Sequence, residues 1–311
     1  MKRKTVIIGN GFDLNLGLPT SYSHFIKSEY FIHLLSSNKL CRYLADTYER
    51  CNWVDIEASL KEYAEKTESP KMFFSDYTAL KKSLIKYMDS LSYSSIDEES
   101  VAYNFIGDCC YECFRPADKN HITILNFNYT KSVSKVIDHI YKIGTFANYI
   151  TNIPFEYWAV HGSAKNNHIV LGVEDSADIP SSCNFIKKTY DSEHLSFKAK
   201  ILKCDELIVF GHSLGESDDS VFRPFFQKQL RSDAEPKKVT IYYKGENGYE
   251  DLLNRVDDLT DYHISKFREK NRLHFKDVDD NRVSFAEVIK NISNTCVDII
   301  ESYRTIRDLL K

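Results

Sequence analysis

The chain has 311 residues, of which 42% are hydrophobic and 13% aromatic, and it carries a formal net charge of −4 at pH 7. This composition excludes a disordered chain and disfavours nucleic acid as a partner, because a duplex-DNA binder would present a broad basic surface. Apolar runs long enough for a membrane span are absent, and the apolar run at residues 6–8 is too short for a signal peptide, so we expect a cytoplasmic protein with no membrane partner. Of the eight cysteines only Cys110 and Cys113 have C-x-x-C spacing, which predicts buried thiols and no metal site.

The chain opens with a short run of β-type residues that leads directly into a glycine turn. Gly9 and Gly11 follow this run, and Gly17 and Pro19 come shortly before a helix that we expect to continue to about residue 36. Glycine lets the backbone approach a phosphate, and the N–H groups at a helix N-terminus supply positive potential. The stretch therefore predicts an anion-binding turn, although an ordinary strand-to-helix turn would have the same composition.

Residues 38–116 contain no convincing strand and are predicted to form a helical insertion within a single α/β domain that spans residues 1–311. Four helices are expected, at residues 40–51, 53–66, 70–91 and 96–114. Asp55 and Glu57 lie at positions i and i+2, which point to different sides of a helix. We interpret them as capping or solvated carboxylates.

Strand periodicity returns at residues 121–127, followed by a helix at 131–141. Asn128 and Thr130 lie between the two, where a parallel sheet would have its ligand site, although both residues also cap helices well. Two further short strands are expected at 157–161 and 169–172. The first ends on His161. A lone histidine is more often structural than catalytic, and the position of His161 at a strand end before Gly162 strengthens the catalytic interpretation.

The rest of the chain continues the alternation of strands and helices. Strands are expected at 206–210 and 239–243, helices at 191–203, 220–230 and 249–259, a hairpin of 273–275 with 283–285, and a final helix that ends at 311. The fold class is therefore α/β, with a mostly parallel, doubly wound sheet. We predict that residues 6–8, 122–125 and 207–210 are parallel strands, so that Gly9, Asn128 and Gly211 converge at one crevice.

The segment after residues 206–210 admits two functions. Residues 211–215, Gly-His-Ser-Leu-Gly, fit the G-x-S-x-G elbow of a serine hydrolase with Ser213 as the nucleophile. The acid and the histidine of a triad would come from Asp257, Asp258, Asp261, His263 and His274. That interpretation gives the opening glycine turn no role, and it places four polar residues where an elbow helix usually packs on its sheet.

Four blocks together resemble one family. The stretch from Gly9 to Tyr22, residues 126–130, His161-Gly162, and the segment from Gly211 to Asp218 resemble the AbiH family of bacterial abortive-infection proteins. More distantly, the same blocks are similar to the sirtuin-type NAD-binding fold, which implies a sirtuin-like Rossmann domain. That resemblance implies Asn128 and His161 as the catalytic residues. It implies NAD contacts from Gly9, Asn10, Gly11, Phe12, Asp13, Gly17, Pro19, Thr130, Gly211, His212, Ser213 and Asp218.

The resemblance implies a phage-defence protein that binds NAD and hydrolyses it to nicotinamide and ADP-ribose. The four-cysteine zinc ribbon of sirtuins is absent from the sequence, which argues against protein deacylation. Cleavage of the glycosidic bond needs a placed water, a ribose-orienting group and a base, and no metal. A phage-derived trigger and a second copy of the chain are the partners that fit this interpretation. A sensor that binds NAD or a related nucleotide without cleaving it stays open beside the serine hydrolase.

Overall fold

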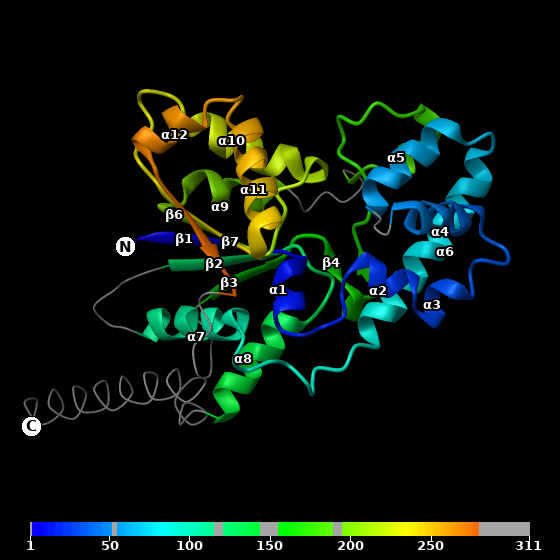
Figure 1. The fold of residues 1–311 in the computed structure, drawn as a ribbon, viewed down its shortest axis with the longest axis horizontal. Helices are drawn as coiled ribbons and strands as arrows, with labels where there is room; N and C mark the ends of the chain where they lie inside the picture. The colour runs from blue at the N-terminus through cyan, green and yellow to red at the C-terminus, as the bar shows by residue number, and fades with distance from the viewer. Residues whose placement is uncertain (1, 52–54, 115–120, 144–154, 189–194, 280–311) are drawn as a thin grey trace, which may run out of the picture.

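A parallel sheet forms the centre of the computed structural model, which describes residues 2–51, 55–114, 121–143, 155–188 and 195–279. Within these residues six strands pair in the order β3-β2-β1-β6-β7-β8, and every pair is parallel (Figure 1). The strands are β1 (Arg3–Ile8), β2 (His121–Asn126), β3 (Phe155–Ala159), β6 (Glu206–Phe210), β7 (Lys238–Tyr243) and β8 (Arg272–Asp277). The chain thus leaves β1 to one side and later returns to its other side, so the topological switch point of a doubly wound sheet lies between β1 and β6.

Helices cover both faces of the sheet, which is why its central strands are continuous apolar runs. One face packs on α1 (Asn10–Asn15), α7 (Val101–Phe114) and α8 (Ser132–Ile143). The other face packs on α9 (Leu195–Lys203), α10 (Asp219–Gln229), α11 (Gly245–Leu259) and α12 (Ile264–Lys270). Figure 1 shows these two helix layers below and above the strands.

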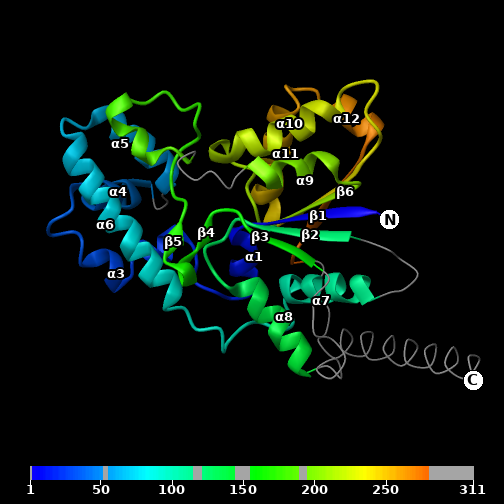
Figure 2. The same ribbon diagram turned by 180° about the vertical axis from the view of Figure 1, so that it is seen from behind.

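The remaining helices form a second cluster beside the sheet, which we call the helical unit. It consists of α2 (Tyr22–Ile26), α3 (Glu29–Ile32), α4 (Lys39–Cys51), α5 (Ile56–Lys66) and α6 (Pro70–Asp89). Residues 164–186 pack against it and contain η2 (Ala164–Asn166), β5 (His168–Ile169) and η3 (Ser181–Ile186). The two-residue strand β4 (Gly162–Ser163) pairs with β5, and both views of the ribbon show this segment between the sheet and the helical unit (Figure 2).

The structure confirms the central prediction about the sheet. Val6 pairs with Ile124 and with Ile208 in parallel register, so β1, β2 and β6 end at one edge. The four helices expected between residues 38 and 116 are present as α4 to α7, but α7 starts at Val101 rather than at residue 96. In the described part of the chain no helix combines the length and the apolar character that a membrane crossing requires.

Other sequence predictions are wrong. The helix expected to begin near residue 20 is divided into α2 and α3 at Ser28, whose backbone is extended. An unpredicted helix, α1, begins directly after Gly9 and ends at Asn15. Two residues later Gly17 has a positive φ of +82°, which lets the Leu18 N–H donate to the Asp13 carbonyl.

Two expected strands also differ. Of the strand expected at 169–172 only Ile169 lies in a strand, β5, and β5 is outside the main sheet. The first arm of the expected hairpin is β8, which pairs in parallel with β7 after the unpredicted helix α12. The second arm at 283–285 and the final helix lie outside the described residues.

Candidate functional site

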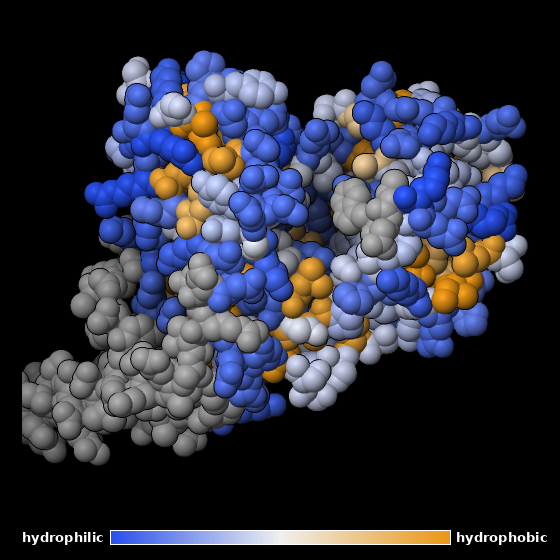
Figure 3. All heavy atoms as spheres, viewed as in Figure 1, coloured by the Kyte–Doolittle hydropathy of each residue, from blue (hydrophilic) through white to orange (hydrophobic). Residues whose placement is uncertain are grey.

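A cavity of about 1290 Å³ lies at the carboxyl edge of β1, β2 and β6. Parallel sheets of this topology place their ligands at that edge. The helical unit forms the opposite wall through α5, and Figure 3 shows a hollow between the two halves of the molecule. Ten of the predicted site residues line the cavity: Gly9, Asn10, Asp13, Asn128, Thr130, His161, Gly211, His212, Ser213 and Asp218.

The glycines of the first and last predicted blocks bring two loops into backbone contact. A Cβ atom on Gly9 would lie 2.5 Å from His212 Cα, and one on Gly211 would lie 2.2 Å from Phe12 N. The Gly11 N–H donates to the Gly211 carbonyl at 2.7 Å. The glycines are therefore required by loop packing at the switch point, which is a structural role besides the phosphate contact predicted from the sequence.

Asn128 and Asp13 connect the loop after β2 to this pair of loops. Asn128 Nδ2 donates to the Gly9 carbonyl at 3.0 Å, which confirms that Gly9, Asn128 and Gly211 converge. Asp13 is fully buried and accepts hydrogen bonds from the Thr130 hydroxyl at 2.7 Å and from the Ser132 hydroxyl. Burial raises the pKa of Asp13 to about 6, although the hydrogen bonds from Ser132, Thr130 and Asn128 favour the charged form.

This carboxyl group predicts a pH-dependent difference in stability. The folded-state pKa of Asp13, about 6, lies above the ordinary value of 3.8. The stabilisation from protonated Asp13 is therefore present below the ordinary pKa and is lost as the pH rises through the folded-state value. We expect Asp13→Asn, relative to the parent, to gain about 2 kcal/mol in the free energy of unfolding between pH 4 and pH 7. Urea unfolding across this range measures it, with Asp138→Asn on the exposed face of α8 as the control. A difference independent of pH would contradict the assignment.

Asp218 is the centre of the most strongly charged part of the cavity wall. Its Oδ1 atom lies 3.1 Å from His161 Nε2 and 3.0 Å from Lys188 Nζ, and its Oδ2 atom lies 3.5 Å from His212 Nε2. Burial alone would raise the pKa of Asp218, but the charge of Lys188 and the two histidines outweigh it and hold that pKa well below the usual value. Asp218 is therefore an anion that orients three donors.

The two histidines differ in how their ring nitrogens are engaged. His212 Nδ1 accepts the Leu214 N–H at 2.9 Å, which leaves its Nε2 to carry the proton toward Asp218. His161 contacts Asp218 through Nε2, and its Nδ1 has no hydrogen bond within the described ranges. With its Nε2 proton on Asp218, a neutral His161 has an unprotonated Nδ1 in the cavity wall.

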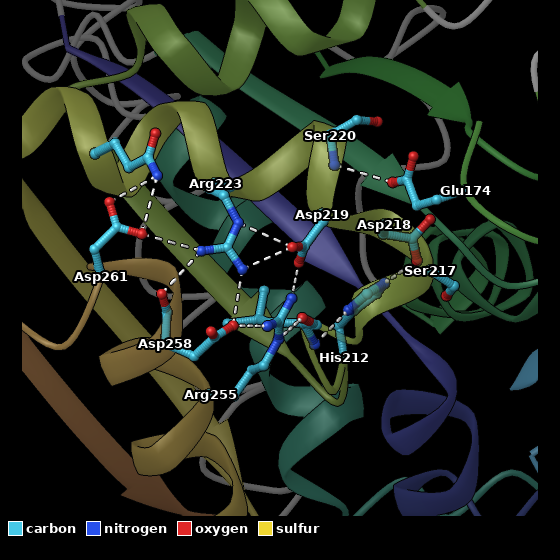
Figure 4. Close-up of polar contacts among 12 residues, drawn as sticks. Glu174, His212, Ser217, Asp218, Asp219, Ser220, Arg223, Arg255, Asp258 and Asp261 are labelled. Carbon is cyan, nitrogen blue, oxygen red and sulfur yellow. Dashed lines mark hydrogen bonds and ion pairs between the residues drawn. The ribbon is translucent and has the colours of Figure 1, made fainter. Parts of the chain in front are cut away.

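The loop that carries His212 and Asp218 is fixed from behind by two arginines. Arg223 pairs with Asp219 at 2.7 Å and with Asp258 at 2.8 Å, and Arg255 contacts the same two carboxylates (Figure 4). Arg255 Nε also donates to the carbonyl of Leu214, whose φ is +55°. The arrangement holds a strained backbone in place beside the cavity.

Four predicted ligand contacts do not line the cavity. Phe12 is fully buried in the core against Phe210, and Gly11 packs on Gly211. Gly17 ends α1, and the Pro19 carbonyl accepts the Tyr87 hydroxyl. These residues build the loop rather than face the hollow.

Sequence reasoning missed Lys188 and misjudged Glu57. Asp55 caps α5 as expected, since it accepts from the N–H groups of Glu57 and Ala58. Glu57 is not solvated: its side chain is 12% exposed and lies 3.2 Å from Lys188 Nζ. Neither residue lies in a motif, so only the spatial contact with Asp218 shows their importance.

His161 and Asn128 are also more enclosed than expected. Each is 7% exposed, although both were expected at open strand ends. His161 follows β3 by two residues and directly precedes β4. The helical unit covers this edge of the sheet. Truncation of Asn128 would remove one of the donors to the Gly9 carbonyl, which also accepts the Phe12 N–H at 2.9 Å.

Among the described residues no group of three or more histidine, cysteine, aspartate or glutamate side chains is arranged to hold a metal ion. Cys41, Cys109, Cys110, Cys183 and Cys204 are buried thiols, and Cys113 is half-buried.

Comparison with known proteins places this geometry in a family. No curated protein gives a significant match to the chain. The family model described as "Bacteriophage abortive infection AbiH" matches residues 5–243, which include β1, the helical unit and the strands up to β7. The matched range contains every residue of the cavity wall named above except Asp258. The chain therefore belongs to the AbiH family.

Proposed function

We propose that this protein binds NAD in the cavity and hydrolyses its nicotinamide–ribose bond during abortive infection. The observation that carries the proposal is the His161–Asp218 pair at the switch-point crevice. A carboxylate that fixes one imidazole nitrogen leaves the other as a base of defined position. On this proposal the chain is a sirtuin-like NAD-binding domain that hydrolyses NAD to nicotinamide and ADP-ribose.

The reaction requires a water, a base and an environment that tolerates positive charge. The water oxygen forms a bond to the ribose C1′, the C1′–N bond breaks, and its electron pair leaves with neutral nicotinamide. His161 Nδ1 takes the proton of the attacking water. Asn128, held by Gly9, orients the water and the ribose.

The charge of the cavity wall favours the positively charged nicotinamide ribose of NAD. Most charged lining residues are carboxylates, and several come from α5 and its N-cap: Asp55, Glu57, Glu62 and Glu65. Negative potential stabilises the cationic nicotinamide ring and the oxocarbenium character that develops on the ribose. Among the described residues two cations line the cavity, Lys61 and Arg223, and Arg223 is engaged with Asp219 and Asp258. The Gly9 N–H donates to the Phe210 carbonyl, so the pyrophosphate would depend on Lys61 and on the backbone at Asn10.

The test is to incubate the purified protein with NAD and to measure nicotinamide release by chromatography. NAD binding is measured in parallel by calorimetry. A concentrated sample is included, because assembly with a second copy or a phage-derived trigger could be required for activity. Release above the rate without protein supports the proposal. Binding without release at any concentration favours the nucleotide-sensor alternative.

The serine-hydrolase alternative has weaker support from the geometry. In the described chain no hydrogen bond joins Ser213 to a histidine, and the residues of the loop with positive φ are Gly211 and Leu214 rather than Ser213. The next α-helix, α10, begins only at Asp219, whereas a nucleophile elbow passes directly from strand to helix. We expect a fluorophosphonate probe to leave Ser213 unlabelled. Labelling that disappears in Ser213→Ala would reverse this ranking.

A further inference from the structure

We propose that Lys188 is a positioning residue that holds the Asp218 carboxylate and thereby sets the orientation and the proton affinity of His161. This inference rests on the proposed function for its catalytic meaning. Lys188 lies outside every motif recognised in the sequence, and it reaches His161 only through Asp218. Its role is therefore separate from those of the cavity residues assigned above.

Each of the three N–H donors of the Lys188 ammonium group has an acceptor. Nζ lies 3.0 Å from Asp218 Oδ1, 3.0 Å from the Ser217 carbonyl and 3.2 Å from Glu57 Oε2. Three N–H donors thus meet three acceptors, and the side chain is only 10% exposed. A buried ammonium group with such partners is fixed in position, because any movement would leave a charge without compensation.

Lys188 and His161 share one oxygen of Asp218. Both donors lie within 3.1 Å of Oδ1, so the lysine charge reduces the carboxylate charge that His161 experiences. We therefore expect removal of the lysine charge to strengthen the electrostatic attraction between Asp218 and His161. The other titratable groups around His161 are His212, which faces Asp218 Oδ2, Glu57 beyond Lys188, and Tyr129, whose ring centroid lies 6.4 Å away.

Lys188 also makes the helical unit part of the catalytic arrangement. Glu57 lies in the first turn of α5, where the Asp55 cap fixes the backbone. Lys188 joins this carboxylate to Asp218 in η6 (Glu216–Asp218), next to the sheet. The base on the sheet edge is thus held in part by a residue of the opposite wall.

The experiment is a proton titration of His161 by NMR in the full chain with isotopically labelled histidine, in the absence of NAD. The His161 signal is assigned by its loss in His161→Gln. In Lys188→Met we expect the midpoint of the His161 titration to rise by about one pH unit, a tenfold gain in proton affinity, because Asp218 then acts on His161 alone. Lys188→Arg keeps the charge and should restore a midpoint close to that of the parent.

Two further variants keep the test decisive. Lys187→Met is the matched control, since Lys187 Nζ donates to the Asp175 carbonyl and not to Asp218. Glu57→Gln removes the competing anion while Lys188 stays, so the His161 midpoint should fall, and this variant serves if Lys188→Met does not fold. Midpoints equal to that of the Lys187→Met protein in the folded variants would overturn the proposal.

Activity provides a separate readout. If NAD is hydrolysed, the acid limb of the pH–rate profile should move up in Lys188→Met by the same amount as the His161 midpoint. If the parent releases no nicotinamide, the proposed function fails, and the titration still decides whether Lys188 controls His161.

Discussion

His161→Gln is expected to reduce nicotinamide release by about 10² to 10⁴-fold, the usual contribution of a general base. A glutamine amide can still donate to Asp218 but has no basic nitrogen to accept the proton of water. The loss should appear in kcat, with NAD affinity changed much less, because the loops around Gly9 and Gly211 stay intact. Single-turnover kinetics and calorimetric NAD binding measure the two quantities.

A control for this prediction is His33→Gln, which changes an exposed histidine at the end of α3. It should match the parent in turnover and in thermal melting. His161→Gln should also melt close to the parent, since it keeps a donor for the buried Asp218. Turnover of His161→Gln equal to that of the parent would remove His161 from the mechanism.

Gly211→Ala is expected to lower the free energy of unfolding by about 3 kcal/mol. The backbone at Gly211 has a φ of +65°, and an added Cβ would lie 2.2 Å from Phe12 N and 2.4 Å from Gly11 C. Left-handed backbone costs an alanine about 1–2 kcal/mol, and overpacking adds about 1–3 kcal/mol. The neighbours are backbone atoms of another loop, so the clash can be relieved only if the two loops separate. Thermal melting should shift down by roughly 6–12 °C.

The chain offers two matched glycines for comparison. Gly248 lies within α11 with no atom inside 4 Å of an added Cβ, so Gly248→Ala should be neutral or stabilising by up to about 1 kcal/mol. Gly245 has a φ of +66° but the same open surroundings, so Gly245→Ala reports the backbone term alone. If Gly211→Ala has the same melting temperature as Gly245→Ala, the two loops can move apart freely.

The sheet was predictable because its signals are local. Residues 206–210 form an apolar run between polar residues, and such a run in an α/β chain indicates a buried parallel strand. Because three strands were predicted to be parallel, the convergence of Gly9, Asn128 and Gly211 followed from the geometry of the sheet edge. The division of the first expected helix at Ser28 was not predictable, because apolar spacing continues on both sides of it.

The candidate site was predictable only in part. His161 and Asp218 lie in separate motifs, and sequence alone gave no reason to pair them or to add Lys188. The burial of Asn128 and His161 depends on the helical unit, which covers the edge of the sheet, and strand patterns contain no information about that cover. Long-range ion pairs between irregular segments have no periodic signature, so they appear only when the chain is folded.

The central position of β1 affects the order in which the protein can be made. Ile8 pairs with Asn126 on one side and with Phe210 on the other, so β1 is synthesised before both partners and must wait for two distant segments. Contacts of such sequence separation slow folding, and a nascent chain emerges from the ribosome at only a few residues per second. The crevice at the carboxyl edge of the sheet lacks the side that β6 forms until Phe210 has left the ribosomal exit tunnel. A translation product that stops before Glu206 would therefore lack both the third strand and Asp218, and it would be released without a formed site.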